Sequence, residues 1–67
     1  MSRTLAEREV LEVLIEQDDA MTVREIHDKG GIEIDHVRSA LRRLNVLGTV
    51  FPTQTRAGLS AWRAEEK

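Results

Sequence analysis

Three arginines in the segment HVRSALRRL, residues 36–44, are the side chains of this chain best suited to bind an anion. Arg38, Arg42 and Arg43 carry rigid, planar guanidinium groups that match the geometry of phosphates and carboxylates. The apolar residues of the segment recur at the spacing of one helix face, and they are Val37, Leu41 and Leu44, with Ala40 beside them. The arginines lie on the other side of this helix, where they form a solvated face or meet an anionic partner.

Charge is distributed unevenly along the chain, whose net charge is −2. Residues 1–34 carry four basic and nine acidic side chains, a net charge of −5. Residues 35–63 carry five arginines against Asp35 alone, a net charge of +4, and the last three residues add −1. The basic segment 35–63 favours an anionic partner, although the negative net charge of the whole chain does not.

Length and composition restrict the class of protein. The 67 residues predict a single domain, 1–67, and a domain of this size buries only about 60% of its unfolded surface. The chain has no Cys, which excludes disulfides and thiolate metal sites. No run of about 18 apolar residues is present, and the charged segment MSRTLAEREV is unlike a secretory signal. We therefore expect a cytoplasmic protein without a membrane partner.

Catalytic and metal chemistry has few candidate residues. Ser39 has no His or Asp partner to activate it, and no Gly-rich phosphate loop follows a strand. His27 and His36 have Asp28 and Glu33 nearby in sequence, but a zinc site requires three or four convergent ligands. The sequence predicts no enzyme activity, no cofactor, no bound metal and no small-molecule ligand.

A first helix is predicted over residues 5–17. Thr4 and Glu7 have the spacing of a capping box at its start. The apolar side chains cover more than half of its circumference, more than one core-facing stripe needs, and they are Val10, Leu11, Val13, Leu14 and Ile15. This breadth indicates either a central helix that is packed on two sides or a surface for dimerisation.

A second helix, about 22–29, is predicted with Thr22 as its N-cap and Glu25 in the capping-box position. Its apolar residues Val23 and Ile26 are expected to face inward. Two glycines, residues 30–31, are expected to end it, because glycine adopts left-handed C-terminal geometry without strain.

The third helix, about 34–47, carries the three arginines and is stopped by Gly48. Ile32 is expected to enter the core just before it. The short connection, the apolar residue and the long helix together predict a helix-turn-helix unit with the preceding helix.

A β-hairpin, about 49–64, is predicted to follow. It divides into a strand TVF (49–51), a polar loop TQTRAG (53–58) and a return strand SAWRA (60–64). Pro52 restricts the first strand to an edge position. Alternation places either Val50 or Phe51 toward the core. A lone hairpin is unstable in water, so we expect Trp62 to anchor it on the helices.

The order of these elements resembles that of the winged helix-turn-helix superfamily, over roughly residues 5–64. The resemblance is carried by TVREI in the second helix, GI at 31–32, VRSALRRL at 37–44, GTV at 48–50 and AWRA at the close of the wing. It implies a mainly α protein with a small β-hairpin, an α+β fold of three helices and a wing.

In the DNA-binding members of this superfamily, the third helix enters the major groove and the wing touches the backbone or the minor groove. The resemblance implies contacts to double-stranded DNA from His36, Arg38, Ser39, Arg42 and Arg43, with Asp35 beside them, and from the wing-tip residues Thr53, Gln54, Thr55 and Arg56. Arginine can bond the major-groove edge of guanine with two hydrogen bonds, and arginines elsewhere hold phosphates. By position, Arg38 reads base edges and Arg43 and Arg56 contact phosphate, and Arg42 can exchange roles with either helix arginine.

Two features depart from the DNA-binding pattern. Glu33 stands where many DNA-binding relatives place Ser or Thr, and Asp35 follows it. Carboxylates there suit the helix dipole but repel phosphates. The wing tip also carries a single arginine. We therefore expect modest affinity per monomer, which is compensated if two copies bind together.

The sequence predicts a sequence-specific DNA-binding protein, a small transcription regulator that acts as a homodimer through its first helix. The alternative is a winged-helix protein–protein adaptor within a larger assembly, without direct DNA binding. Three features favour this alternative: the negative net charge of the chain, the acidic start of the third helix and the broad apolar surface of the first helix.

Overall fold

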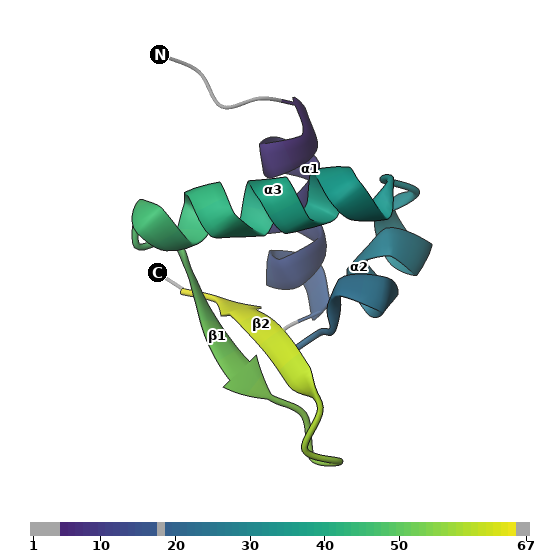
Figure 1. Ribbon diagram of the computed structural model, residues 1–67, viewed down its shortest axis with the longest axis vertical. Coiled ribbons are helices and arrows are strands. Elements are labelled where there is room, and N and C mark those ends of the chain that lie inside the picture. The colour runs from purple at the N-terminus through teal and green to yellow at the C-terminus, as the bar shows by residue number, and fades with distance from the viewer. Residues whose placement is uncertain (1–4, 18, 66–67) are drawn as a thin grey trace.

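Three helices and an antiparallel hairpin make up the protein in a computed structural model that describes residues 5–17 and 19–65. The elements are α1 (Leu5–Gln17), α2 (Val23–Gly30), α3 (Ile34–Val46), β1 (Val50–Gln54) and β2 (Ser60–Ala64). In Figure 1, α3 crosses in front of α1, α2 lies near the N-terminal end of α3, and the hairpin extends below α3. This arrangement confirms the predicted fold class, mainly α with a small β-hairpin.

The core lies where the three helices meet the base of the hairpin. Its buried residues come from every element and are Val10, Leu14, Met21, Ile26, Ile32, Val37, Ala40, Leu41, Leu44, Val50 and Ala64. Ile32 is buried as expected, with 7% of its surface exposed. The open question in the first strand is also settled, because Val50 is fully buried and Phe51 is 44% exposed.

The apolar surface of α1 is used mostly inside the chain. Val10 and Leu14 are buried, and Leu11 and Val13 are partly buried against the core. Ile15 is 50% exposed. Packing on more than one side, rather than an open apolar face, therefore accounts for most of the breadth of this helix. The predicted cap at Thr4 lies outside the described residues.

The start of α2 has the predicted capping box. The Thr22 hydroxyl oxygen accepts the Glu25 N–H at 3.1 Å, and a Glu25 carboxylate oxygen accepts the Thr22 N–H at 2.9 Å. Two of the backbone donors that have no partner within the helix are thus satisfied reciprocally. The helix begins at Val23, one residue later than predicted, because Thr22 itself is the cap.

The turn between α2 and α3 is fixed by two glycines with different roles. Gly31 takes the left-handed conformation (φ 68°) that caps α2. Gly30 remains helical, contrary to expectation, and its role is close packing. A Cβ there would lie 3.0 Å from Ile32 Cδ1 and 3.3 Å from Val13 Cγ2. The His27 ring also spans the turn, because its Nδ1–H donates to the Ile32 carbonyl oxygen at 2.6 Å.

The first strand of the hairpin runs over Val50–Gln54, whereas the sequence predicted residues 49–51. Thr53 and Gln54 pair with Ala61 and Ser60, so both belong to β1 and not to the loop. The ladder continues to this point, and the chain reverses only over 55–59, where Gly58 has a φ of 84°. At the other end, α3 stops at Val46, one residue earlier than predicted.

A third backbone segment pairs with the hairpin, and the sequence did not predict it. The Met21 N–H donates to the Trp62 carbonyl at 3.0 Å, and the Trp62 N–H donates to the Met21 carbonyl at 2.7 Å. β2 therefore lies between Met21 and β1, which leaves β1 at the edge, as Pro52 predicted. Because the Trp62 backbone groups point toward Met21, its pair with Pro52 is a non-hydrogen-bonded one. The ladder thus requires no N–H at residue 52.

Candidate nucleic-acid interface

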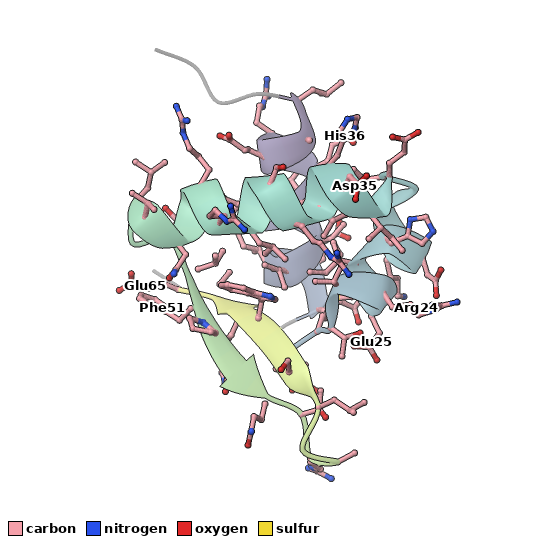
Figure 2. All side chains as sticks on the ribbon, viewed as in Figure 1. Arg24, Glu25, Asp35, His36, Phe51 and Glu65 are labelled. Atoms are coloured by element: carbon pink, nitrogen blue, oxygen red, sulfur yellow. The ribbon has the colours of Figure 1, made fainter. Side chains whose placement is uncertain are left out.

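The side of α3 opposite its buried stripe carries a row of exposed residues. The row follows helical spacing of four, three and four residues, and it consists of Asp35, Ser39, Arg42 and Val46, which we call the outward stripe. Figure 2 shows Asp35 on the side of α3 that is turned away from α1. The outward stripe is therefore the part of α3 most accessible to a large partner.

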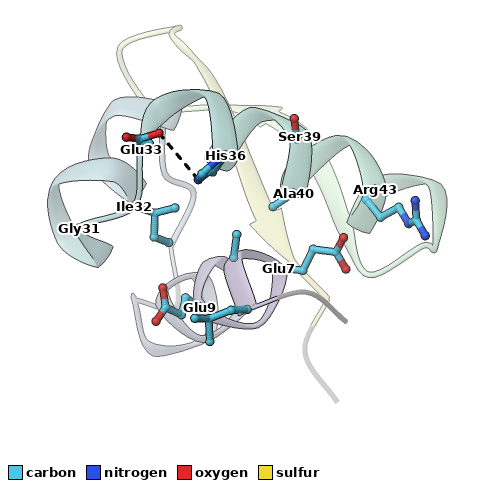
Figure 3. Close-up of a pocket in the computed structure, with 11 residues that line it drawn as sticks. Glu7, Glu9, Gly31, Ile32, Glu33, His36, Ser39, Ala40 and Arg43 are labelled. Carbon is cyan, nitrogen blue, oxygen red and sulfur yellow. Dashed lines mark ion pairs between the residues drawn. The ribbon is translucent and has the colours of Figure 1, made fainter. Parts of the chain in front are cut away.

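One flank of the outward stripe faces α1 across an open groove of about 700 Å³. His36 and Arg43 line this groove, together with Glu7 and Glu9 of α1 (Figure 3). Nδ1 of His36 lies 3.9 Å from a Glu33 carboxylate oxygen, and both side chains are largely exposed. Exposed pairs of this kind contribute little to stability.

The other flank faces the hairpin across a hollow of about 360 Å³. Three polar residues of α3, the indole of Trp62 and two apolar side chains line this hollow. The polar residues are Arg38, Arg42 and Asn45, and the apolar ones are Val23 and Leu41. Trp62 is half-buried and packs against the core, in agreement with its expected role as the anchor of the hairpin. Arg38 thus stands between the outward stripe and the wing, and Arg42 of the stripe also borders this hollow.

The three arginines of α3 are all exposed. Within the part of the chain that the structure describes, none of Arg38, Arg42 and Arg43 forms a salt bridge. No Asp or Glu occurs anywhere in residues 36–64. The three side chains are therefore open to solvent as predicted, but they do not share one face, because Arg43 lies on the α1 flank and Arg38 on the hairpin flank.

The tip of the hairpin contains one residue with a structural task. The Thr55 hydroxyl accepts the Leu59 N–H at 3.2 Å, and the Thr55 backbone N–H donates to the Leu59 carbonyl at 2.9 Å. The other predicted wing residues, Thr53, Gln54 and Arg56, are exposed. Thr55 therefore shapes the turn that presents Arg56.

Two exposed residues of α3 were missed by the sequence reasoning. Asn45 lines the hollow beside the hairpin, and Val46 ends the outward stripe with 79% of its surface exposed. Helical periodicity could have identified both, because they lie seven residues after Arg38 and Ser39.

Other kinds of site find little support among residues 5–17 and 19–65. No group of three or more His, Cys, Asp or Glu side chains in these ranges could hold a metal ion. No helix in the same ranges is long and apolar enough to cross a membrane. The exposed face of α3 is therefore the feature on which a functional interpretation rests.

The fold matches solved structures, although no protein-family model and no curated protein matches the sequence. A point mutant of ZitR from Lactococcus lactis has a TM-score of 0.84 with 22% identity, over 98% of this chain and 45% of that one. The Vibrio cholerae ferric uptake regulator, Fur, whose crystal structure reveals a rearrangement of its DNA-binding domains, has a TM-score of 0.79 with 20% identity, over 100% of this chain and 56% of that one. The chain thus spans about half the length of each of these proteins.

Proposed function

We propose that this chain, a winged helix-turn-helix domain, binds double-stranded DNA sequence-specifically and acts as a small transcription regulator. In this proposal α3 lies in the major groove with its outward stripe toward the bases, and the hairpin contacts the backbone. A major groove about 12 Å wide admits an α-helix. The observation that carries the proposal is the exposure of Arg38, Arg42 and Arg43 on a helix whose opposite face is fully committed to the core.

The distribution of charge supports this orientation. The acidic side chains of the described residues lie on α1, in and just before α2, at the start of α3 and at Glu65, whereas residues 36–64 contain five arginines and no acid. The resemblance to Fur adds support, since Fur has DNA-binding domains. A partner that approaches the outward stripe and the wing together meets the arginines of residues 36–64, with Asp35 as the acid at the start of the stripe.

The salt dependence of binding to a random duplex tests DNA binding. Neutralising phosphates releases counterions, so the logarithm of the affinity falls steeply and linearly with the logarithm of the salt concentration. We expect a fluorescence anisotropy titration with a labelled duplex to show binding at low salt and a steep loss at high salt. Absence of binding at both concentrations would contradict the proposal.

Variants of single arginines test which residues contact base edges and which contact phosphates. Arg38 and Arg42, beside or in the outward stripe, are expected to contact base edges, so replacing either by Ala costs about 1–3 kcal/mol on a preferred site and relaxes base preference. Arg43 on the α1 flank and Arg56 at the wing tip are expected to contact phosphate. Their replacement weakens all sequences alike and reduces the salt slope by about one. Arg8→Ala on α1 removes the same charge away from this surface and serves as the matched control.

Homodimerisation through α1 is a further part of the proposal. Its support is now narrower than the sequence indicated, because only Leu5 and Ile15 of this helix are exposed apolar residues, at 69% and 50%. Sedimentation at micromolar concentration distinguishes a dimer from the 7.6 kDa monomer. A monomer that binds DNA tightly would remove this part and leave DNA binding intact.

A second candidate function is favoured by one specific observation. Val46, Leu47 and Phe51 are exposed at 79%, 56% and 44% and lie within six residues at the junction of α3 and the wing. A surface of this kind suits a protein partner, as a winged-helix adaptor would need. If the chain is such an adaptor, replacing Leu47 by Glu abolishes binding of the protein partner. If it binds DNA, the arginine variants are the ones that weaken binding.

A further inference from the structure

Asp35 occupies an unexpected place on the surface proposed to bind DNA. It is the first residue of the outward stripe, two helical turns before Arg42, and its side chain is exposed (Figure 2). Within residues 5–17 and 19–65 its side chain forms no hydrogen bond or salt bridge. A carboxylate on a polyanion-binding surface lowers the affinity for phosphates, so its position requires an explanation.

Helix stability alone is an insufficient explanation for Asp35. An acid in the first turn interacts favourably with the helix dipole. Glu33 already supplies a carboxylate at the N-terminus of α3, on the α1 flank beside His36. The dipole can thus be satisfied without an acid on the outward stripe, and Asp35 is the acid that would face the bases.

We propose that Asp35 is a specificity-determining residue whose carboxylate accepts a hydrogen bond from the exocyclic amino group of a cytosine in the major groove. This inference rests on the proposed DNA binding. An ionised carboxylate is only an acceptor. Cytosine presents an amino donor in the major groove, guanine presents two acceptors, thymine presents O4, and adenine places its amino donor beside the acceptor N7. Among the four bases, cytosine therefore fits a carboxylate best, and the acid repels the others to different degrees.

The distance between Asp35 and Arg42 along α3 predicts how far apart the two contacted bases lie in the DNA. Seven residues of α-helix rise about 10.5 Å, which corresponds to about three base-pair steps of 3.4 Å. If Arg42 bonds a guanine, the cytosine read by Asp35 lies about three base pairs from it. Ser39 stands between them on the outward stripe, and a serine hydroxyl can form a hydrogen bond with more than one kind of base. A preferred site is thus expected to contain a separated cytosine and guanine.

Selection of duplexes from a pool with a randomised core tests this assignment. The selection is carried out with the unaltered chain, with Asp35→Asn, and with Glu33→Gln as the matched control. Both variants remove one negative charge from the N-terminal end of α3, but only the first changes the outward stripe. Circular dichroism establishes that all three proteins are folded under the binding conditions.

We expect the unaltered chain and Glu33→Gln to select the same site. Asp35→Asn should lose the preference for cytosine at one position by roughly tenfold and should favour adenine there, because an amide can bond adenine N6 and N7 together. Its affinity for random duplex should also rise, by roughly two- to fivefold at low salt, since one repulsive charge is gone.

Three results would overturn the inference. If Asp35→Asn selects the same site as the unaltered chain, Asp35 does not read a base, and the proposed DNA binding stands. If the unaltered chain binds all duplexes equally, DNA binding stands without sequence preference, and no residue determines specificity. If the unaltered chain binds no duplex at low salt, the proposed function itself fails and the inference fails with it.

Discussion

The helix-turn-helix and the wing of this chain are held in place by different means. α2 begins with a capping box, and its turn into α3 is fixed by a left-handed glycine and a side-chain hydrogen bond from His27. The two helices bury Ile26, Leu41 and Leu44 completely or nearly so. The hairpin buries residues only at its base and along one side, and its tip is held by Thr55 alone among the described side chains. The helical part is thus a rigid frame that fixes the outward stripe, whereas the wing can adjust locally to a partner.

The largest effect is expected from the centre of the helical frame. Replacing the fully buried Ile26 by Ala should lower the free energy of unfolding by about 2–5 kcal/mol, which is a large share of the stability of so small a domain. Circular dichroism should show a protein that is mostly unfolded at 25 °C. Ile26→Val is the control and should cost only about 1 kcal/mol. A cooperative transition of unchanged midpoint in Ile26→Ala would refute the idea of a rigid frame.

A smaller effect is expected where the wing meets this frame. Trp62 is half-buried, so Trp62→Ala should lower the free energy of unfolding by about 3 kcal/mol, the lower end of the range for large aromatic residues. Phe51→Ala removes an exposed aromatic from the same hairpin and should cost much less. Thermal melting followed by circular dichroism compares the two. Equal losses from both variants would mean that the indole does not anchor the wing.

A still smaller effect is expected at the start of α2. Thr22→Ala removes the capping hydroxyl and should lower the free energy of unfolding by about 1 kcal/mol. Thr22→Ser keeps an acceptor oxygen and should retain most of the stability. Urea unfolding measures both. If Ser and Ala prove equally destabilising, the hydroxyl oxygen is not what stabilises the helix.

The smallest effect is expected at the wing tip. Thr55→Ala removes one partly exposed hydrogen bond and should change the free energy of unfolding by about 0.5 kcal/mol. The Leu59 amide should exchange with solvent faster, while the Met21 and Trp62 amides keep their protection. Thr53→Ala, on the adjacent strand, should leave the Leu59 amide unchanged. Faster exchange at Met21 in Thr55→Ala would show that the wing and the frame are more tightly coupled than the structure indicates.

The sequence predicted the parts of this fold that have a local signal. Thr22 and Glu25 marked a capping box, Ile32 and the stripe around Leu41 marked the core, and the helix bounds fell within one residue of those observed. The backbone pairing of Met21 with Trp62 could not be predicted in this way, because it joins residues far apart in the chain. Its local signal in the sequence is limited to an apolar residue, Met21, directly before the cap at Thr22.

The candidate site was predictable as a set of residues but not as a surface. Periodicity placed Arg38, Arg42 and Arg43 off the buried stripe, and all three are exposed. Which flank each occupies depends on where α1 and the hairpin lie around α3, and this is tertiary information. The task of Thr55 in the turn likewise depends on a reversal over 55–59, and this reversal is set by the extension of β1 to Gln54.

The proline in β1 has a consequence for the behaviour of the protein at high concentration. The outer edge of β1 pairs with no other described strand, and exposed strand edges are templates for pairing with a second chain. At residue 52, the backbone groups of an ordinary residue would point outward, but Pro52 offers no N–H there. The edge beside the exposed Phe51 therefore lacks a donor at its middle position, which makes the growth of intermolecular sheets along it unfavourable. Pro52 therefore costs the hairpin no hydrogen bond and at the same time weakens the outer edge of β1 as a template for a second copy.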